Sequence, residues 1–566
     1  MRLSKTRKSR AQGRQRPLAA STLVTAGLAL TVTGGVARAA EIPSGNSDVS
    51  IRWDNTVKYS TAARIEDRSG KVEGVDQNNN LDDGDRNFDK GLISNRVDLL
   101  SEVDLVYKNR YGVRVSGAAW YDSVYNQGND NDFAGSTNNV SVNNDSFTSE
   151  TKKLHGRNAE LLDAFAFGKF DLPNEMRLNM RGGRFAQLYG ESLFMGANGV
   201  AAAQGPIDVV KALSVPNSQF KEIMMPVGQV SSQLQVNEDW AVGAYYQFEY
   251  RKNRLPAAGS YFSNGDILDD GGESLYGAGS GPGGAYFSRG NDIEAKDSGQ
   301  GGFQVRWKAN PNLDLGAYFA QFHDKSPKVY LRLSGGATTT SHGTDVGDYM
   351  LVYPENIRVY GASFGTTVGE TNVSGEVSMR TNQPLASANG DIMLDSTNDH
   401  DNNGNPLYAV GRTLHANLSA ISVGGGSAIW DGITMTSELA YNRLLDVTNG
   451  RPLDPDVSYG AMAGRMVIEP SYFQVIPGLD VTVPVGLGYG IFGHSALGPT
   501  VFNPEGVGDV SIGVKGVYEN TWNVALNLTH YMGKSGQLTS TTNRYYSYDQ
   551  YFADRDFVSF SVQRSF

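Results

Sequence analysis

The sequence predicts an all-β protein: a transmembrane antiparallel β-barrel of about sixteen strands, with a range of 14 to 20. The chain has 67 Gly, 28 Tyr and 23 Phe and a mean hydropathy of -0.37. Beyond residue 39 it has no apolar run near the ~18 residues that a membrane helix needs. It is therefore apolar mainly on alternate residues, as strands of a membrane barrel are.

The N-terminus predicts export. Residues 2–16 are rich in Lys and Arg, residues 18–35 are small and apolar, and Ala37-Arg38-Ala39 forms an A-x-A cleavage site. We interpret residues 1–39 as a signal peptide, with an N-terminal membrane anchor as the alternative, and residues 40–566 as a single barrel domain. Residues 40–566 carry 41 basic and 60 acidic side chains, a formal net charge of -19. This acidity argues against a nucleic-acid partner, and the absence of Cys is compatible with an oxidising compartment.

Segments with a two-residue period recur along the chain. Most have about nine to eleven residues, the length of a tilted strand that crosses a bilayer. Many begin or end on Trp or Tyr, as expected for aromatic girdles at the two membrane interfaces. The clearest segments are 51–59, 97–107, 113–121, 176–184, 240–250, 303–307, 313–319, 357–363, 373–379, 433–441, 479–489, 510–518, 522–530 and 557–566.

The face opposite the apolar residues carries charges of both signs in the middle of the predicted strands. Charge there requires water, so we expect a wide barrel with lipid outside and a hydrated lumen inside. The alternative is the solvated outside of a large β-solenoid or sandwich. The predicted pore-lining residues are Asp104, Arg114, Glu249, Arg306 and Arg358.

The connections between strands differ in length. Residues 70–89, 126–150, 262–294 and 382–408 are long, polar and rich in Gly, Asn and Asp, which predicts external loops. The short joints 309–312 and 518–521 are predicted periplasmic turns.

Residues 196–220 match neither type of connection. Small residues precede PIDVVKAL, with Pro206 at a plausible helix start. We expect a short helix that folds into the lumen or covers its periplasmic mouth and so narrows the pore, with Pro206, Asp208 and Lys211 at the constriction. An ordinary connecting helix is the alternative.

The last segment, FVSFSVQRSF, has an apolar and a polar face. A terminal aromatic residue on an amphipathic last strand resembles the signal that the barrel-assembly machinery reads, so we expect Phe560, Val562 and Phe566 to form it. Arg564 departs from this pattern, because it lies on the apolar parity. A long cationic side chain can reach water from the edge of a membrane.

Calcium is the most plausible metal. Asp399, Asp401 and Asn403, followed by Gly404, match the first half of an oxygen-rich calcium loop, but Val410 occupies the position of the closing Glu. A solvated acidic loop is the alternative. A weaker acidic pattern is formed by Asp82, Asp83, Asp85 and Asp89. No other cofactor is expected.

Enzyme motifs lack their structural context. Residues 361–365 read G-x-S-x-G but lie within an alternating segment, without the strand-turn-helix of a nucleophile elbow. Residues 488–493 read G-x-G-x-x-G, but Pro499 interrupts the region where a helix should follow. We therefore expect no enzyme, although outer-membrane hydrolases that are barrels keep that class open.

Several blocks resemble a known family: residues 80–102, 115–126, 154–172, 190–199, 214–222 and 253–263. They are similar to the proteobacterial outer-membrane family catalogued as domain of unknown function 1302. The resemblance implies an outer-membrane barrel of a Gram-negative bacterium. It also implies a periplasmic partner and an inner-membrane exporter of the resistance-nodulation-division superfamily, with traffic of lipids or other hydrophobic compounds. It brings no catalytic residues.

The expected function is passive passage of a small or hydrophobic compound through the lumen, in contact with outer-membrane lipid outside. A docking barrel that works with the periplasmic partner and the exporter is the second hypothesis, and a hydrolase is the third. The oligomeric state is left open between monomer and trimer.

Overall fold

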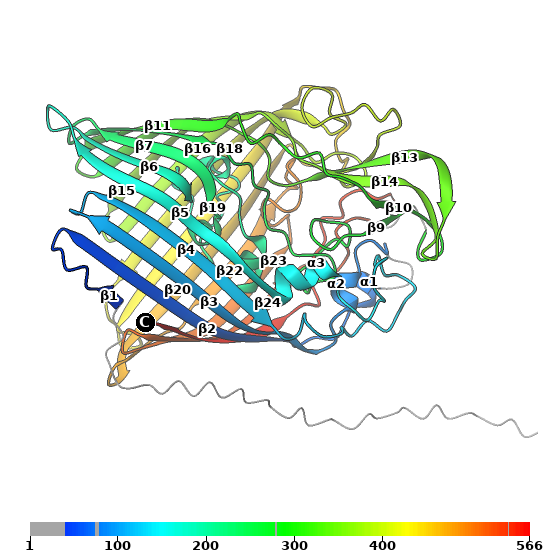
Figure 1. Ribbon diagram of the computed structural model, residues 1–566, viewed down its shortest axis with the longest axis horizontal. Coiled ribbons are helices and arrows are strands. Elements are labelled where there is room, and N and C mark those ends of the chain that lie inside the picture. Colours follow the sequence, from blue (N-terminus) through cyan, green and yellow to red (C-terminus); the bar gives the residue numbers. More distant parts are fainter. Residues whose placement is uncertain (1–39, 74–77, 278–279, 541–542) are drawn as a thin grey trace, which may run out of the picture. The chain divides into compact units, whose positions relative to one another are not determined.

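The computed structural model describes residues 40–73, 78–277, 280–540 and 543–566 (Figure 1). The predicted signal peptide, residues 1–39, lies outside the described residues. Within the described ranges, no helix is both long enough and apolar enough to cross a membrane.

Eighteen antiparallel strands close into a barrel. Each strand pairs with the next one around the sheet, and β25 (Phe557–Ser565) pairs with β2 (Val49–Arg64), which completes the ring. One strand position is shared by β21 (Leu479–Thr482) and β22 (Val485–Phe492), and β1 (Ala40–Ile42) is an additional short partner of β2. Closure leaves no unpaired edge strand that lipid would have to cover.

The remaining barrel strands follow the chain order. They are β3 (Gly91–Tyr107), β4 (Tyr111–Asp122), β5 (Arg157–Asp171), β6 (Arg177–Phe185), β7 (Val227–Gln235), β8 (Trp240–Gln247), β11 (Gln300–Asn310), β12 (Leu313–Phe322), β15 (Ile357–Val368), β16 (Thr371–Pro384), β18 (Val410–Gly424), β19 (Gly432–Val447), β20 (Gly460–Ile476), β23 (Gly508–Tyr518) and β24 (Trp522–Met532).

The strand number exceeds the central expectation of about sixteen, although it lies within the expected range. Strands such as β5 and β20 lack a clean alternation of apolar and polar residues. In β20, for example, the inward positions Ala461 and Ala463 are small, apolar and fully buried. Small buried residues on the inner face remove the contrast on which the two-residue period depends.

The barrel is apolar outside and polar inside. On β3 the side chains of Val97, Leu99 and Val103 are exposed, whereas the intervening Asp98 and Glu102 point to the interior. Aromatic side chains lie at the strand ends on the outer face; the rings of Trp240 and Trp307 stack at 5.4 Å. An exposed apolar band with aromatic ends is the surface that a lipid bilayer requires.

The two ends of the barrel differ. Neighbouring strands are joined at one end by short turns, such as residues 108–110, 311–312 and 519–521, and at the other by long connections. All four predicted external loops belong to the long-loop end, on the right in Figure 1, and both predicted short turns belong to the other end. Since barrels of this kind have short periplasmic turns, we assign the long-loop end to the cell exterior.

The long connections form an ordered cap. It contains a five-stranded sheet of β17 (Ile392–Leu394), β13 (Lys328–Thr339), β14 (Thr344–Val352), β10 (Ala285–Arg289) and β9 (Ser274–Tyr276). It also contains the short helices α1 (Gly70–Glu73), α2 (Asp83–Arg86), α3 (Ser149–Thr151) and η1 (Lys152–Gly156).

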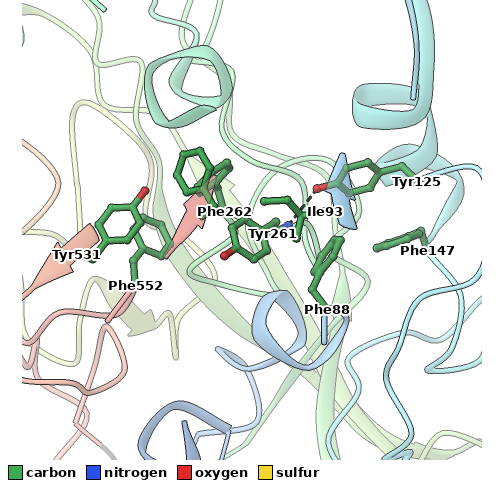
Figure 2. Close-up of a cluster of buried hydrophobic side chains, with 9 residues drawn as sticks. Phe88, Ile93, Tyr125, Phe147, Tyr261, Phe262, Tyr531 and Phe552 are labelled. Carbon is green, nitrogen blue, oxygen red and sulfur yellow. Dashed lines mark hydrogen bonds between the residues drawn. The ribbon is translucent and has the colours of Figure 1, made fainter. Parts of the chain in front are cut away.

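An aromatic cluster joins the bases of four of these connections (Figure 2). The ring of Phe88 packs edge-on against Tyr125 at 5.7 Å and against Tyr261 at 5.4 Å. Phe262 continues the cluster to Phe552 at 6.1 Å, near the last strand. Because these side chains are buried and come from distant parts of the sequence, the cluster holds the loop bases in one arrangement.

A test of the two faces uses adjacent residues on β24, Leu526 outside and Asn527 inside. Leu526→Arg is expected to lower the free energy of unfolding in lipid vesicles by about 2–4 kcal/mol, because an arginine would face hydrocarbon. Asn527→Arg should have a much smaller effect, since its side chain reaches the lumen. Urea titration followed by tryptophan fluorescence measures both. Equal effects of the two substitutions would contradict the assignment of the faces.

Candidate functional site

The connection between β6 and β7 folds into the barrel instead of joining the cap. This lumenal segment, residues 186–226, contains η2 (Val200–Ala203), α4 (Val209–Ser214) and α5 (Phe220–Ile223). Its Asn217 side chain lies 2.9 Å from Ser511 Oγ on β23 and 3.1 Å from Arg465 on β20. The segment thus reaches the inner face of strands on the far side of the sheet.

The three predicted constriction residues lie in this segment. The Asp208 carboxylate caps α4 by accepting the Lys211 N–H at 2.9 Å, and it pairs with Arg254 at 2.8 Å. Lys211 Nζ donates to the Glu222 carbonyl at 2.7 Å, and the Pro206 carbonyl accepts the Met225 N–H at 2.8 Å. The helix begins after Asp208, later than the proline start suggested, because Asp is the stronger N-cap. Whether these residues narrow a pore stays a prediction.

Two buried glutamates of the barrel wall hold the segment by its amides. Glu376 on β16 accepts the Glu191 N–H at 2.8 Å, the Ser192 hydroxyl at 2.7 Å and the Val200 N–H at 3.0 Å. Glu438 on β19 accepts two further amides, those of residues 194 and 195. The two side chains are 4% and 1% exposed. A buried carboxylate needs such donors, and these hydrogen bonds to a charged acceptor are strong.

The carbonyls of the same segment have complementary partners. The buried Arg380 guanidinium on β16 donates to the carbonyls of Ala197 at 2.9 Å and Gly199 at 2.7 Å. His415 on β18 lies 3.0 Å from the Asn198 amide oxygen. The wall therefore supplies acceptors for the amides and donors for the carbonyls of a chain that is not helical here.

None of the four anchors Glu376, Glu438, Arg380 and His415 is among the residues predicted from the sequence as a functional site. The sequence feature that could have identified them is a charged or amide side chain in the middle of a predicted strand. Nothing in the sequence showed that residues near 190–200 would meet them.

An apolar patch on the neighbouring strands β12 and β15 also supports the segment, and it reverses the expected parity of β15. Tyr189 and Val200 pack against Tyr318, Ile357 and Val359 of the inner face. The neighbouring Arg358 therefore points outward, where its guanidinium donates to Gln321 at 3.1 Å. The prediction that Arg358 lines the pore is wrong, because here the lumenal segment, and not water, covers the inner face.

Three of the other predicted wall residues share the inner face. Arg114 lies 3.6 Å from Asp104 and also pairs with Glu102. Arg306 on β11 pairs at 3.1 Å with Glu191 of the lumenal segment. Their role in conduction stays a prediction.

Glu249 lies outside this set. It follows the end of β8, and its carboxylate pairs with Arg184 at 3.5 Å and accepts the Gly228 N–H. Arg184 has the same parity as the exposed Met180, so this pair lies at the outer rim of the long-loop end. The alternation of outward and inward side chains that begins at Trp240 ends at Gln247. It therefore cannot predict the direction of the Glu249 side chain, which lies in the loop.

A cavity of about 480 Å³ remains between the lumenal segment and the wall. Its lining combines Glu191 and Lys221 of the segment with Asp314 and Asn372 of the wall, near the turns 311–312 and 369–370. The space has both polar and apolar lining residues and lies toward the short-turn end. A second hollow, of about 430 Å³, is lined mainly by apolar side chains of the outer face, including Phe364, Val377 and Leu418.

The predicted calcium ligands do not form one group. Asp401 accepts the N–H groups of Asn403 at 3.0 Å and Asn405 at 2.7 Å, and Asn403 Oδ1 accepts from Asn356 at 3.0 Å. Among the residues that the structure describes, two groups bring three metal-ligating atoms within 4.8 Å of one another: Glu66, His530 and Asp556, and Asp395, Asp399 and His400. Asp399 thus belongs to the second group, whereas the Asp401 carboxylate accepts hydrogen bonds from its own loop, and calcium binding by this loop stays a prediction.

The remaining sequence motifs lie on strands. Ser363 of the G-x-S-x-G match is in the middle of β15, with its hydroxyl 2.9 Å from Tyr318 Oη. The glycines 488 and 490 belong to β22.

At the C-terminus, Phe560 and Val562 have the outward parity, and Phe566 exchanges two backbone hydrogen bonds of 2.9 Å with Asn55. Arg564 lies over the Trp522 ring at 5.0 Å, a cation–π contact at the turn end.

Comparison with known proteins gives one family and a set of distant structures. The family model described as "Protein of unknown function (DUF1302)" matches residues 20–566. No curated protein matches the chain.

Among solved structures, OccAB1 of Acinetobacter baumannii is 9% identical, with 94% of this chain and 99% of that chain covered and a TM-score of 0.41. OccD3 (OpdP) of Pseudomonas aeruginosa is 9% identical, with 94% of each chain covered and a TM-score of 0.39. The Salmonella typhi OmpF complex with daunomycin is 8% identical, with coverages of 93% and 100% and a TM-score of 0.36.

Glu376→Gln tests the anchoring of the lumenal segment. Glutamine has one acceptor oxygen and turns an amide group toward the former donors, so the loss is on the order of 1–3 kcal/mol. We expect the amides of Glu191 and Val200 to exchange hydrogen for deuterium about tenfold faster. The matched control is Glu469→Gln, which changes another lumenal carboxylate that pairs with Lys515 at 3.4 Å. Unchanged exchange in Glu376→Gln would show that Glu376 does not hold the segment.

Proposed function

This chain belongs to the family of proteins of unknown function DUF1302, and we propose from its geometry that it is a passive channel of the Gram-negative outer membrane. The closed barrel with its exposed apolar band supports a place in lipid. The export signal in the sequence supports the outer membrane. The compound that passes would be small or hydrophobic.

The lumenal segment is the observation that carries this proposal. A connection of about forty residues is drawn into the barrel, where Glu376 and Arg380 of β16, Glu438 of β19 and its own Asn217, which contacts β20 and β23, attach it to the wall. An inactive scaffold has no need of such a segment, whereas a channel uses one to set the width of its passage. Filtering by size and charge at a narrow point then requires no cofactor.

The charges on the wall support a channel with little preference for one sign of ion. Arg465 pairs with Asp509 at 2.7 Å, and Lys515 pairs with Glu469. Arg114 is likewise surrounded by acids. Because cations of the wall pair with neighbouring acids, the wall does not carry charge of a single sign, and the solute is filtered by size and by the local charges at the narrow point.

A second candidate function, docking to a periplasmic partner that works with an inner-membrane exporter, has one observation in its favour. At the short-turn end, β20 continues to Ile476, and Phe473, Val475 and Ile476 are 56–58% exposed. Exposed apolar residues at a barrel end are suited to a protein contact.

For assembly, we propose that the barrel-assembly machinery recognises Phe560, Val562 and Phe566.

Conductance in planar bilayers tests the channel. The purified protein should give discrete steps, and deletion of residues 206–213 should enlarge them by about twofold or more, because α4 would leave the lumen. The control deletes Gly335 and Gly336, which are exposed in the cap and have no neighbour within 4 Å of an added Cβ. A silent barrel that copurifies with a periplasmic protein would instead favour docking.

A further inference from the structure

Three carboxylates lie together inside the cap, away from the lumen. Asp82 and Asp83 are at the start of α2, and Asp266 belongs to the connection between β8 and β11. Their exposures are 1%, 3% and 1%. The sequence pattern that includes Asp82 and Asp83 is the weaker of the two acidic patterns, and the channel proposal makes no use of it.

Each carboxylate uses one of its two oxygens. Asp266 Oδ2 accepts the N–H groups of Asp82 at 2.8 Å and Asp83 at 3.1 Å, which brings it to the start of α2. Asp83 Oδ2 accepts the Asn138 N–H at 3.0 Å. Asp82 Oδ2 pairs with the guanidinium of Arg86. These contacts tie together three loop connections, with Asn138 supplied by the one between β4 and β5.

The second oxygen of each carboxylate is buried without a hydrogen-bond donor. The same is true of Asn138 Oδ1, whose residue is 2% exposed. The fully buried Ser136 hydroxyl lies beside Asp82 but makes no hydrogen bond of normal geometry. A buried polar atom without a partner costs about 1–3 kcal/mol, and more when it is charged. A cluster of such acceptors is a site where a cation could be bound.

The charges of the cluster lead to the same conclusion. Arg64 pairs with Asp85 at 2.8 Å and with Asp554 at 3.3 Å, and Arg555 lies 3.5 Å from Asp85. Arg64, Arg86 and Arg555 are thus three arginines that face five aspartates. The aspartates are Asp82, Asp83, Asp85, Asp266 and Asp554. The buried group thus has two more negative than positive side chains.

We propose that Asp82, Asp83 and Asp266, with Asn138 and Ser136, bind a Ca²⁺ ion in the cap. The available donors are all oxygens, carboxylate, amide and hydroxyl, which is the ligand set of a hard cation. A divalent ion matches the excess of two negative charges. In the structure the three carboxylates do not bring their ligand atoms within 4.8 Å of one another, so the ion draws them closer. Calcium thus fixes the β2–β3, β4–β5 and β8–β11 connections to each other, whether or not the lumen conducts.

Calcium titration of the processed protein, folded in detergent micelles and stripped with EGTA, tests the site. Isothermal titration calorimetry should show one Ca²⁺ bound per chain. Asp83→Asn should weaken binding at least about tenfold, because it removes a charged ligand. The matched control is Asp399→Asn, which changes an acidic cap residue outside the site and should bind Ca²⁺ as the unchanged protein does. Mg²⁺ should bind more weakly, since the protein oxygens are not arranged as an octahedron.

Terbium luminescence gives a second readout at the site. Tyr276 lies beside Asp83 and donates its hydroxyl hydrogen to the Thr137 carbonyl at 2.8 Å. Tb³⁺ bound there should be sensitised by this ring, and Ca²⁺ should displace it. Tyr276→Phe should reduce the luminescence without a comparable loss of Ca²⁺ affinity. Ser136→Ala, a neutral change, should weaken Ca²⁺ binding if Asp83→Asn does not fold, as judged by heat-dependent migration on gels.

Two results would overturn the proposal. One is the absence of Ca²⁺ binding to the folded, unmodified chain at concentrations on the order of 10 mM, beyond the range of extracellular calcium modules. In that case protons neutralise the carboxylates. The other is binding that Asp399→Asn abolishes and Asp83→Asn leaves intact, which would place the ion in the loop of residues 399–404.

Discussion

The closure of one antiparallel sheet on itself is the constraint on which the rest of the molecule depends. In a bilayer every backbone N–H and C=O of a spanning segment must find a partner within the protein. The pairing of β25 with β2 meets this requirement along the last open edge. Once the sheet is closed, it has an outside and an inside. The two-residue period of each strand then separates side chains into those that meet lipid and those that meet the lumen.

The same rule applies to the chain inside the lumen, with different partners. The lumenal segment around residues 190–200 is neither helix nor strand for most of its length, so its backbone groups must be satisfied by the wall. Glu376 and Glu438 accept its amides, and Arg380 donates to its carbonyls. Buried charges at mid-strand are thus part of how a long connection is held across the barrel. They also explain why a charged side chain on the inward face of a strand is not always in contact with water.

The cap follows a third arrangement, because its core is built from loops. Aromatic rings from four connections form its apolar centre, and the arginines 64 and 555 cross-link the aspartates next to it. A network of buried ions is stable only when every charge has a partner. In the cap Arg64 pairs with Asp85 and Asp554, whereas among Asp82, Asp83 and Asp266 only Asp82 has an arginine partner, Arg86. The arrangement of the loop connections in the cap therefore depends on how the charges of its buried carboxylates are compensated.

The sequence by itself determined the class of the protein, because strand period, strand length and aromatic strand ends are local properties that lipid and pairing impose on each strand separately. Long and short connections, and a short helix near Asp208, followed from the same local chemistry, whereas the place of that helix was left open between the lumen, the periplasmic mouth and an ordinary connection. Only the tertiary structure decided that Arg358 faces outward, that Glu249 lies at the rim and that Glu438 anchors the lumenal segment. The same holds for the depth at which Asp82 and Asp83 are buried. The physical reason is that the environment on each side of a strand or loop is supplied by residues more than a hundred positions away, and a local pattern carries no record of them.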